Sequence, residues 1–268
     1  MSFARYPVLV RSGGDLATGI IHRLHQAGFP VGVTELERPL TVRRSVAFSS
    51  AVYDGETTVE GLMARRVENS EQWHQTLIDG GVPVTTSRTI PDWIPTPEVV
   101  VDARLAKRNI DTRLDDAALV IALGPGFDAG RDCDLVIETN RGGRLGRVIE
   151  RGGAEADTGT PGLVDGHGAE RVLRSPRPGP IEWRVQIGDL VAPGDVLGLS
   201  GGKEIHAPFA GVVRGLLHSS CHAELGMKVG DIDPRLDARC DEISDKALAI
   251  GGAVVVATLA WIRSRTPV

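Results

Sequence analysis

A cysteine near the carboxyl end of the chain combines a reactive side chain with a position that suits chemistry. Cys240 lies between an acidic turn, residues 231–235, and a predicted helix that begins after Ser244. A thiol near a helix N-terminus has a lowered pKa, which makes it a better nucleophile and a better ligand for soft metals. The more common role of a cysteine is that of a small buried hydrophobic residue. We predict a catalytic group made of Cys240 and its neighbours Asp231, Asp233 and Arg235.

Polar or glycine-rich segments directly follow five predicted strands in the first half of the chain. These segments are residues 13–15, 35–37, 102–107, 124–126 and 139–142. In an open parallel α/β sheet, ligands bind beyond the carboxyl ends of the strands, so the five segments could line one crevice. Ordinary turns, which favour Gly and Asp, are the alternative. The cofactor-binding residues predicted from these segments are Gly13, Gly14, Asp15, Glu35, Asp102, Lys107, Gly124 and Gly126.

Two arginines follow the second predicted strand. Arg43 and Arg44 could clamp a phosphate by bidentate hydrogen bonds, or they could form a solvated basic turn. We include both among the predicted cofactor-binding residues. His218, Cys221 and His222 are close enough in the chain to share a metal, but no fourth ligand is indicated, and we predict no metal site.

The first glycine turn only partly fits a dinucleotide site. Residues 13–19 lack the middle glycine of the G-x-G-x-x-G pattern, although Glu35 or Glu37 stands at the distance expected for a ribose contact. Asp15 places a carboxylate where a pyrophosphate needs free N–H groups. NAD(P) therefore remains an alternative ligand to be weighed against others.

The order of elements predicts a Rossmann-like domain over residues 1–150. An apolar strand at residues 8–10, a glycine turn, a helix that ends at Gly28 and a strand at residues 31–36 form a βαβ unit. Further apolar runs occur at residues 82–84, 99–101, 118–123 and 135–137. We predict a doubly wound, mainly parallel α/β sheet.

The composition changes near residue 151. A Gly- and Pro-rich linker is predicted over residues 151–180, because such sequences disfavour helices. A weak repeat, G-D-L-V with G-D at residues 188–195 and G-M-K-V with G-D at residues 226–231, flanks H-A-P-F-A-G-V-V. This arrangement resembles the barrel-sandwich of lipoyl and biotinyl carrier domains. We predict a small all-β barrel-sandwich over residues 181–240 and a C-terminal helix over residues 241–268.

Charge and composition exclude some classes of partner. The 268 residues carry a formal net charge of -5, which argues against nucleic acid as a partner. Three scattered cysteines without a CxxC pair predict no disulfide framework. The longest uncharged run, residues 248–262, is shorter than the roughly 20 residues that span a bilayer, and no signal peptide is apparent. We expect a soluble cytoplasmic protein without a membrane partner.

Motifs along nearly the whole chain resemble one family. They include R-x-G-G-D-L-A-T-G at residues 11–19, V-D-A-R-x-A-K at 101–107, L-G-P-G-F-x-A-G at 123–130, D-T-G-x-P-G at 157–162, G-M-K-V-G-D-I-D-P-R at 226–235 and I-S-D-K-A-x-A-I-G-G at 243–252. These motifs are similar to accessory proteins of the selenium-dependent molybdenum hydroxylase system (YqeB-like), distant kin of the XdhC/CoxI maturation proteins. One departure is Gly143, where the family pattern leads us to expect His.

The resemblance implies a maturation factor for a molybdenum hydroxylase, which binds or modifies molybdopterin or its nucleotide form. In that role Arg43 and Arg44 would meet phosphate, Asp102 and Lys107 would orient the ring, and Cys240 would contact a chalcogen or metal. The implied partners are the client hydroxylase and a small-molecule cofactor, and a homo-oligomer is compatible with the sequence. Two alternatives remain open: an NAD(P)-dependent oxidoreductase and a non-enzymatic docking scaffold for the hydroxylase. Whether the protein is an enzyme is also open.

Overall fold

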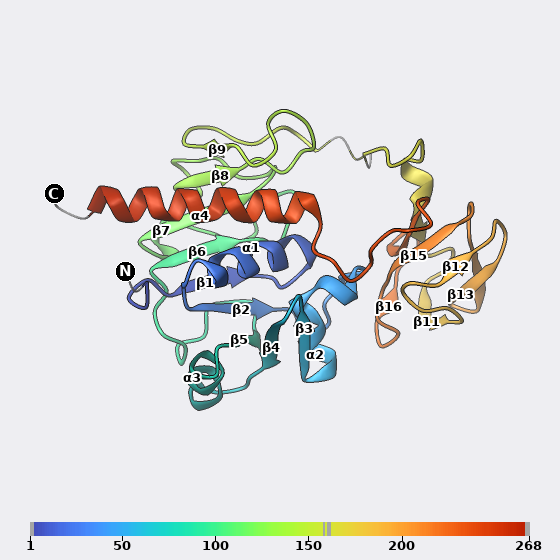
Figure 1. Ribbon diagram of the computed structural model, residues 1–268, viewed down its shortest axis with the longest axis horizontal. Helices are drawn as coiled ribbons and strands as arrows, with labels where there is room; N and C mark the ends of the chain where they lie inside the picture. The colour runs from blue at the N-terminus through green and yellow to red at the C-terminus, as the bar shows by residue number, and fades with distance from the viewer. Residues whose placement is uncertain (1–2, 158, 160–161, 266–268) are drawn as a thin grey trace. The chain divides into compact units, whose positions relative to one another are not determined.

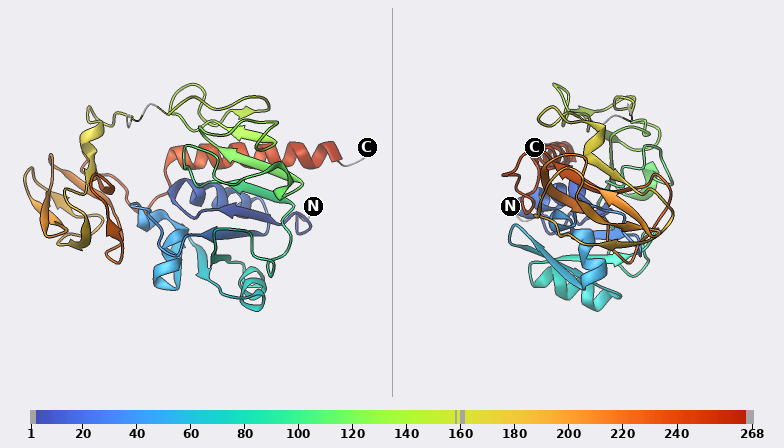
Figure 2. Two further views of the ribbon diagram at one scale, coloured as in Figure 1. Left: turned by 180° about the vertical axis from the view of Figure 1, so that it is seen from behind. Right: turned by 90° about the vertical axis from the view of Figure 1, so that its right-hand side faces the viewer.

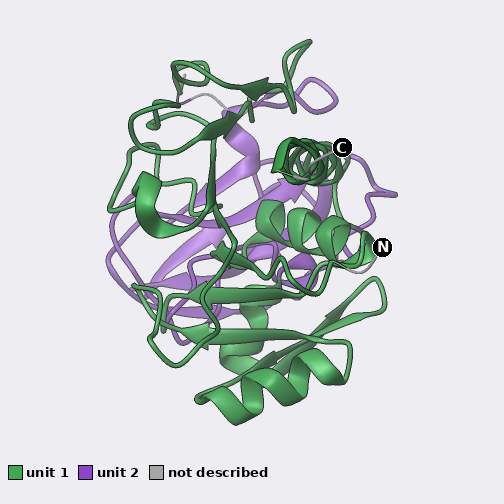
Figure 3. Cartoon of the chain, turned by 90° about the vertical axis from the view of Figure 1, so that its left-hand side faces the viewer, with its two compact units in different colours: residues 1–37, 48–158, 243–268 green, residues 38–47, 159–242 purple. Residues whose placement is uncertain are grey.

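The structure is a computed structural model that describes residues 3–157, 159 and 162–265. The chain forms two compact units, each made of segments far apart in the sequence (Figure 3). Unit 1 contains residues 1–37, 48–158 and 243–268, and unit 2 contains residues 38–47 and 159–242. Three residues of the D-T-G-x-P-G motif, 158, 160 and 161, lie outside the described residues, as do the last three residues of the predicted C-terminal helix.

Unit 1 is built on a nine-stranded sheet in the order β3-β4-β5-β2-β1-β6-β7-β8-β9 (Figure 1). The strands are β1 (Val8–Arg11), β2 (Val31–Glu35), β3 (Glu56–Val59), β4 (Leu62–Arg66), β5 (Val82–Thr86), β6 (Val99–Asp102), β7 (Leu119–Leu123), β8 (Leu135–Ile137) and β9 (Val148–Ile149). Neighbouring strands from β4 to β8 are parallel, whereas the edge strands β3 and β9 are antiparallel to their neighbours.

The predicted Rossmann-like doubly wound sheet is wrong. A doubly wound fold places helices in the crossovers and on both faces of a mostly parallel sheet. Here the sheet is mixed, and the β6–β7 crossover contains only a 3-10 turn, η3 (Leu114–Asp116). Residues 124–134 between β7 and β8, all of them described, form no helix. The apolar runs located strands, but they did not specify what connects them.

Two helices of unit 1 lie side by side although they come from opposite ends of the chain (Figures 1 and 2). They are α1 (Asp15–Gln26) and α4 (Asp245–Arg265). A Cβ atom added to Gly251 would lie 2.4 Å from the carbonyl oxygen of Gly19, and one added to Gly19 would lie 2.6 Å from that of Ala247. The helices therefore approach this closely only because both positions are glycine. The buried residues of α4 are Ala247, Ile250, Gly251, Val254, Ala257 and Thr258.

By length and composition alone, α4 could cross a membrane. However, 39% of its most apolar stretch is buried inside the protein. A single helix of this kind indicates little, because the core helix of a soluble protein passes the same test.

A second core cluster lies on the sheet beneath α3 (Ser70–Ile78). Trp73 of this helix packs against Leu9 and Val100 of the central strands. The ring lies directly over Gly32, where an added Cβ would stand 2.1 Å from the indole. The remaining short helix of unit 1, α2 (Ala51–Asp54), precedes β3.

Unit 2 consists of two four-stranded antiparallel sheets, in the orders β10-β17-β15-β12 and β14-β13-β11-β16. The strands are β10 (Val172–Arg174), β11 (Gly179–Trp183), β12 (Leu190–Val191), β13 (Val196–Ser200), β14 (Lys203–His206), β15 (Gly211–Leu216), β16 (His222–Ala223) and β17 (Lys228–Asp233). These two sheets replace the small barrel-sandwich predicted for residues 181–240. The predicted linker, residues 151–180, contains β10 and the start of β11, so it contributes to both sheets. These strands were not predicted because they are short and lie among Gly and Pro residues, which are typical of loops.

The contact between α1 and α4 gives a direct test by substitution. We expect Gly251→Ala to lower the free energy of unfolding by about 1–3 kcal/mol, the usual cost of an extra methyl group in a packed contact. Gly252→Ala is the matched control, because no atom lies within 4 Å of its added Cβ. That substitution should be neutral or stabilising by up to about 1 kcal/mol, because Ala favours helix. Urea unfolding followed by circular dichroism measures both; equal effects would contradict the close crossing.

Candidate functional site

The predicted ribose contact, Glu35, instead holds the glycine loop of unit 1. Glu35 ends β2, is 6% exposed, and accepts hydrogen bonds from the backbone N–H groups of Gly13 and Leu36, both at 2.7 Å. The Ser12 hydroxyl donates a third bond at 3.1 Å. Burial raises the pKa of this carboxyl, although the three hydrogen bonds pull it down. A ribose contact by Glu35 remains a prediction, but its carboxylate already binds this loop.

The glycine loop is also fixed by a neighbouring backbone segment. Ser49 N–H donates to the carbonyl of Gly13 at 2.8 Å, and a Cβ at position 13 would lie 2.8 Å from the same nitrogen. Gly14 is the N-cap of α1 and supplies no capping side chain. Asp15 is the first residue of α1, where a negative charge suits the positive end of the helix dipole.

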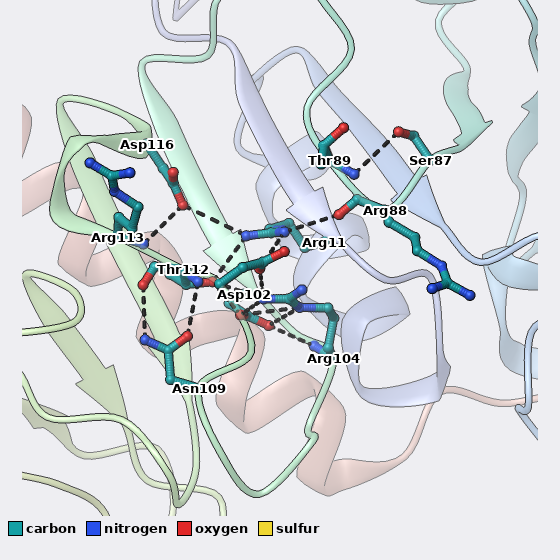
Figure 4. Close-up of polar contacts among 11 residues, drawn as sticks. Arg11, Ser87, Arg88, Thr89, Asp102, Arg104, Asn109, Thr112, Arg113 and Asp116 are labelled. Atoms are coloured by element: carbon teal, nitrogen blue, oxygen red, sulfur yellow. Dashed lines mark hydrogen bonds and ion pairs between the residues drawn. The ribbon is translucent and has the colours of Figure 1, made fainter.

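Asp102, at the end of β6, is the centre of a buried charge network (Figure 4). The side chain is 1% exposed, and its Oδ2 accepts hydrogen bonds from Arg104 Nη2 and from the Thr112 hydroxyl, both at 2.6 Å. Arg104 Nε lies 3.1 Å from the other oxygen, Oδ1. A carboxylate with these partners is saturated, so Asp102 fixes the loop that follows β6. Its role in orienting a ring remains a prediction.

Arg11 adds the neighbouring strand to the same network. It ends β1 in register with Asp102, and its side chain binds the Thr112 hydroxyl at 3.1 Å and Asp111 at 2.7 Å. Burial raises the pKa of Asp111, but the hydrogen bond from Arg104 and the charge of Arg11 outweigh it and lower that pKa. Figure 4 also shows Asp116 facing Arg11 at 3.6 Å.

Backbone contacts bring Lys107 and Gly126 together, and Gly124 lies on the same side of the sheet. Lys107 has a positive φ of 61° and pairs with Asp157 at 2.6 Å. A Cβ at Gly126 would lie 2.4–2.5 Å from backbone atoms of Lys107 and Arg108, so only glycine fits there. Gly124 also has positive φ and lies against Thr139. The strands before these loops are parallel, so the loops share one edge of the sheet.

Arg43 and Arg44 belong to unit 2, whereas the loops predicted to share their ligand belong to unit 1. They lie at the 3-10 turn η1 (Arg44–Val46). Arg44 Nε donates to the carbonyl of Leu216 at 2.8 Å, and Arg43 Nη2 donates to that of Glu242 at 3.3 Å. Arg43 is buried.

Within unit 2 the predicted acidic residues occupy β17 among several arginines. Asp233 is fully buried and binds Arg214 at 2.9 Å and Arg235 at 2.7 Å. Burial raises the pKa of Asp233, but the hydrogen bonds of Arg235 and the charge of Arg214 outweigh it and lower the pKa.

The second carboxylate of β17 is held more loosely. Asp231 lies 3.6 Å from Arg171 and 4.0 Å from Lys228. Burial raises its pKa, opposed by the charges of Lys228, Arg171, Arg214 and Arg43 in that order. The positive charges of Arg43 and Arg214 therefore lower the pKa of Asp231, as they also do for Cys240.

Cys240 lies at a pocket of about 390 Å³ in unit 2. The pocket is lined by Ser45, Ile187, Gly188, Ala238, Arg239, Cys240 and Asp241. The sulfur lies 3.7 Å from the carbonyl oxygens of Val213 and Ala238. The structure thus brings Cys240 together with the predicted residues Arg43 and Asp233, whose charges act on its thiol.

The predicted lowering of the Cys240 pKa is wrong. Burial raises the pKa of this thiol, and the charges of Arg214 and Arg43 lower it without cancelling the effect of burial. The expectation depended on the next helix, but α4 begins only at Asp245 and belongs to unit 1. A catalytic role for Cys240 remains a prediction.

Two residues near the predicted sites, Arg214 and Glu138, were not predicted from the sequence. Arg214 interrupts a strand pattern and was not among the predicted site residues, yet its Nε is buried and has no hydrogen-bond partner among the described residues. Glu138 immediately precedes the predicted segment 139–142, so its position was a signal. In the described part of the chain, no cluster of three or more His, Cys, Asp or Glu could hold a metal ion.

The comparison with curated proteins gives one relative. The chain is 48% identical over 255 residues to the uncharacterized protein YqeB of Escherichia coli (strain K12). This similarity agrees with the resemblance to YqeB-like proteins that the motifs predict. The alignment covers 94% of the chain and 47% of YqeB, so the chain spans about half the length of YqeB. No family model matches the chain.

Solved structures show only distant likeness. An aspartoacylase family protein of Mesorhizobium loti is 13% identical, with a TM-score of 0.27 and coverage of 89% of this chain and 88% of that one. A succinylglutamate desuccinylase/aspartoacylase of Rhodobacter sphaeroides is 16% identical, with the same TM-score and coverage of 87% and 86%. TM-scores this low carry no argument about fold or activity.

The hydrogen bonds of Glu35 predict a stability effect. We expect Glu35→Gln to lower the free energy of unfolding by about 1–3 kcal/mol, because the amide NH2 turns a donor toward backbone donors in a buried site. Glu37→Gln is the control, since Glu37 is exposed, and it should change stability by less than about 0.5 kcal/mol. Thermal unfolding at pH 7 compares them; a harmless Glu35→Gln would show that the loop does not depend on this carboxylate.

The raised pKa of Cys240 predicts slow alkylation. At pH 7, iodoacetamide should react with Cys240 more slowly than with a free cysteine, because less thiolate is present, and the rate should still be rising above pH 9.0, the ordinary value. Burial raises the pKa of Cys133 to about 12, so this second thiol should not react in the same range. Mass spectrometry against Cys240→Ser follows the modification; a rate that levels off well below pH 9 would contradict the shift.

Proposed function

We propose that the chain is a maturation factor for a selenium-dependent molybdenum hydroxylase and that it binds molybdopterin or its nucleotide form. The motifs that run nearly end to end support this role, and so does the 48% identity to YqeB, although YqeB itself is uncharacterized. The chain spans about half the length of YqeB. The maturation role is therefore proposed for this chain, and its extension to full-length YqeB is part of the same proposal.

The observation that carries the proposal is the pocket beside Cys240 in unit 2. The positive charges of two guanidinium groups, those of Arg214 and Arg43, act on the Cys240 thiol and lower its pKa. Guanidinium groups recognise phosphate, and a thiol is a soft ligand, so Cys240 and the two arginines near it offer the two chemistries that a phosphate-bearing, sulfur-containing metal cofactor presents.

A buried donor supports the fit of such a ligand. Arg214 Nε is buried and lacks a partner among the described residues, whereas Arg214 Nη1 is fixed on Asp233 at 2.9 Å. An unsatisfied buried N–H costs free energy, and an oxyanion that accepts its hydrogen bond would remove that cost. Asp233 thus positions a guanidinium whose Nε–H has no partner among the described residues.

In this role the residues of the chain bind and orient the cofactor. When bound, molybdopterin would supply the metal centre and its sulfur ligands. Arg214 and Arg43 would neutralise the phosphate, and Cys240 would face the sulfur-bearing side of the ligand. The raised pKa keeps the Cys240 thiol mostly protonated at neutral pH, so contact with a soft metal would release its proton.

Native mass spectrometry tests the proposal directly. Protein co-expressed with an active molybdopterin pathway should carry a non-covalent pterin adduct that is absent from the denatured mass. Arg214→Gln should lose most of the adduct, because it removes the orphaned donor and one charge. Arg113→Gln is the matched control, since that arginine is exposed and pairs only with nearby acids of its own turn.

Activation of the client provides the second readout. Cys240→Ala should abolish activation of the client hydroxylase while this protein stays folded by circular dichroism. Normal client activity would contradict the role of Cys240. A bare wild-type mass, together with a stable complex between chain and client, would contradict cofactor binding and would support the docking scaffold instead.

A further inference from the structure

The outer side of α4 is apolar along most of its length. Residues 247–262 contain no Asp, Glu, Lys or Arg, yet only 39% of the most apolar stretch of this helix is buried. Val256 is 63% exposed and Leu259 is 37% exposed. Figure 1 shows α4 at the front of unit 1, with no other element of this unit in front of it. Contiguous exposed apolar surface of this kind marks an interaction site.

The exposed residues form one continuous stripe, because residues on one side of a helix recur every three or four positions. We call this stripe the α4 face; its members are Asp245, Leu248, Ala249, Gly252, Val256, Leu259, Ala260 and Arg263. Leu248 and Gly252 are half-buried, and the other members are exposed. No atom lies within 4 Å of a Cβ added to Gly252, so the middle of the stripe is open.

The two ends of the α4 face carry opposite charges. Asp245 binds Arg141 at 2.8 Å, but its side chain remains 75% exposed. Arg263 is exposed in the last turn of the helix. If two copies of α4 lie antiparallel, the acidic end of each meets the basic end of the other, and the helix dipoles also attract. A parallel pair would bring like charges together at both ends. Charge complementarity therefore favours a second, antiparallel copy of this chain.

The pairing of the charged ends also sets the register of such a pair. Contacts across a two-fold axis are mutual, so placing Asp245 opposite Arg263 of the second copy determines all the other pairs. Each large residue of the α4 face then lies opposite a small one. The pairs are Leu248 with Ala260, Ala249 with Leu259, and Gly252 with Val256. Large side chains opposite small ones interdigitate, so the register that matches the charges also matches the shapes.

We propose that the α4 face is a homodimer interface, in which α4 packs antiparallel on α4 of a second copy with Asp245 opposite Arg263. Helices that cross at about 20° stay in contact over several turns, as this pairing requires. One helix from each copy buries less than the roughly 1,200 Å² of a standard stable interface, so we expect a weak dimer with a micromolar Kd.

The dimer and the proposed function involve different parts of the chain. The α4 face belongs to unit 1, whereas the pocket at Cys240 belongs to unit 2. A monomeric chain would leave the Cys240 pocket intact, and a failure to bind molybdopterin would leave the dimer intact. The two can therefore be tested separately on the same full-length chain.

Sedimentation velocity of the full chain, from about 1 to about 200 µM, tests the dimer across the expected range of Kd. Val256→Glu places an unpaired charge in the contact and should raise the Kd at least roughly tenfold. Ile78→Glu is the matched control, because Ile78 is 78% exposed at the end of α3, and it should leave the Kd unchanged. A chain that stays monomeric at every concentration, or equal effects of the two substitutions, would overturn the proposal.

Exchanging the charges tests the antiparallel register. Asp245→Arg places an arginine opposite Arg263, and Arg263→Asp places an aspartate opposite Asp245, so each variant alone should dimerise at least roughly tenfold more weakly. An equimolar mixture of the two variants should recover the dimer, because every charge then meets its opposite in the other chain. A mixture that stays monomeric, with both variants folded by circular dichroism, would contradict this register.

Two further results keep the test decisive. Asp245 also binds Arg141, so its substitution could disturb folding; the comparison of Val256→Glu with Ile78→Glu does not depend on it. Vesicles of neutral phosphatidylcholine test a lipid surface as the occupant of the α4 face, and the wild-type chain should not sediment with them. Vesicle binding by a monomeric wild type that Val256→Glu abolishes would assign the face to lipid and overturn the dimer.

Discussion

The close crossing of α1 and α4 is the constraint on which unit 1 depends. Gly19 and Gly251 leave no room for a side chain between the helices, and this lets the last helix of the chain cover the first one. Ile250 and Val254 then complete the core of a unit whose sheet is formed by residues far earlier in the sequence. The same crossing brings the first turn of α4 near Asp15, whose charge acts on Lys246 in that turn.

Buried carboxylates give the strand ends of unit 1 their fixed shape. Glu35, Asp102 and Glu138 each follow or end a strand, and each is saturated by backbone N–H groups, hydroxyls or arginine. Burying a charge is costly unless it is hydrogen-bonded, so these groups act mainly as supports for loops. By contrast, the Nε of Arg214 in unit 2 is one of the few buried side-chain atoms without a partner among the described residues.

The sequence predicted short-range features better than long-range ones. Apolar runs located β5 and β8 because a strand buried on both faces is a continuous apolar stretch. The fold class was wrong because periodicity does not reveal that β7 and β8 are joined without a helix. Spacing from the glycine turn identified Glu35, but only the structure shows that its partner is the turn itself. For Cys240, proximity to α4 in the chain suggested a lowered pKa, whereas burial within unit 2 decides the shift.

The division of unit 1 into three segments has a consequence for its synthesis on the ribosome. The strands β1 to β9 leave the exit tunnel before α4 has been made, and residues 159–242, the larger segment of unit 2, are translated in between. Until residues 243–265 emerge, the face of α1 around Gly19 and Ile20 has no helix to cover it. Unit 2 can thus reach its native state before unit 1 does. Until α4 is made, unit 1 keeps an apolar face exposed to solvent. A chaperone would be most useful during this period.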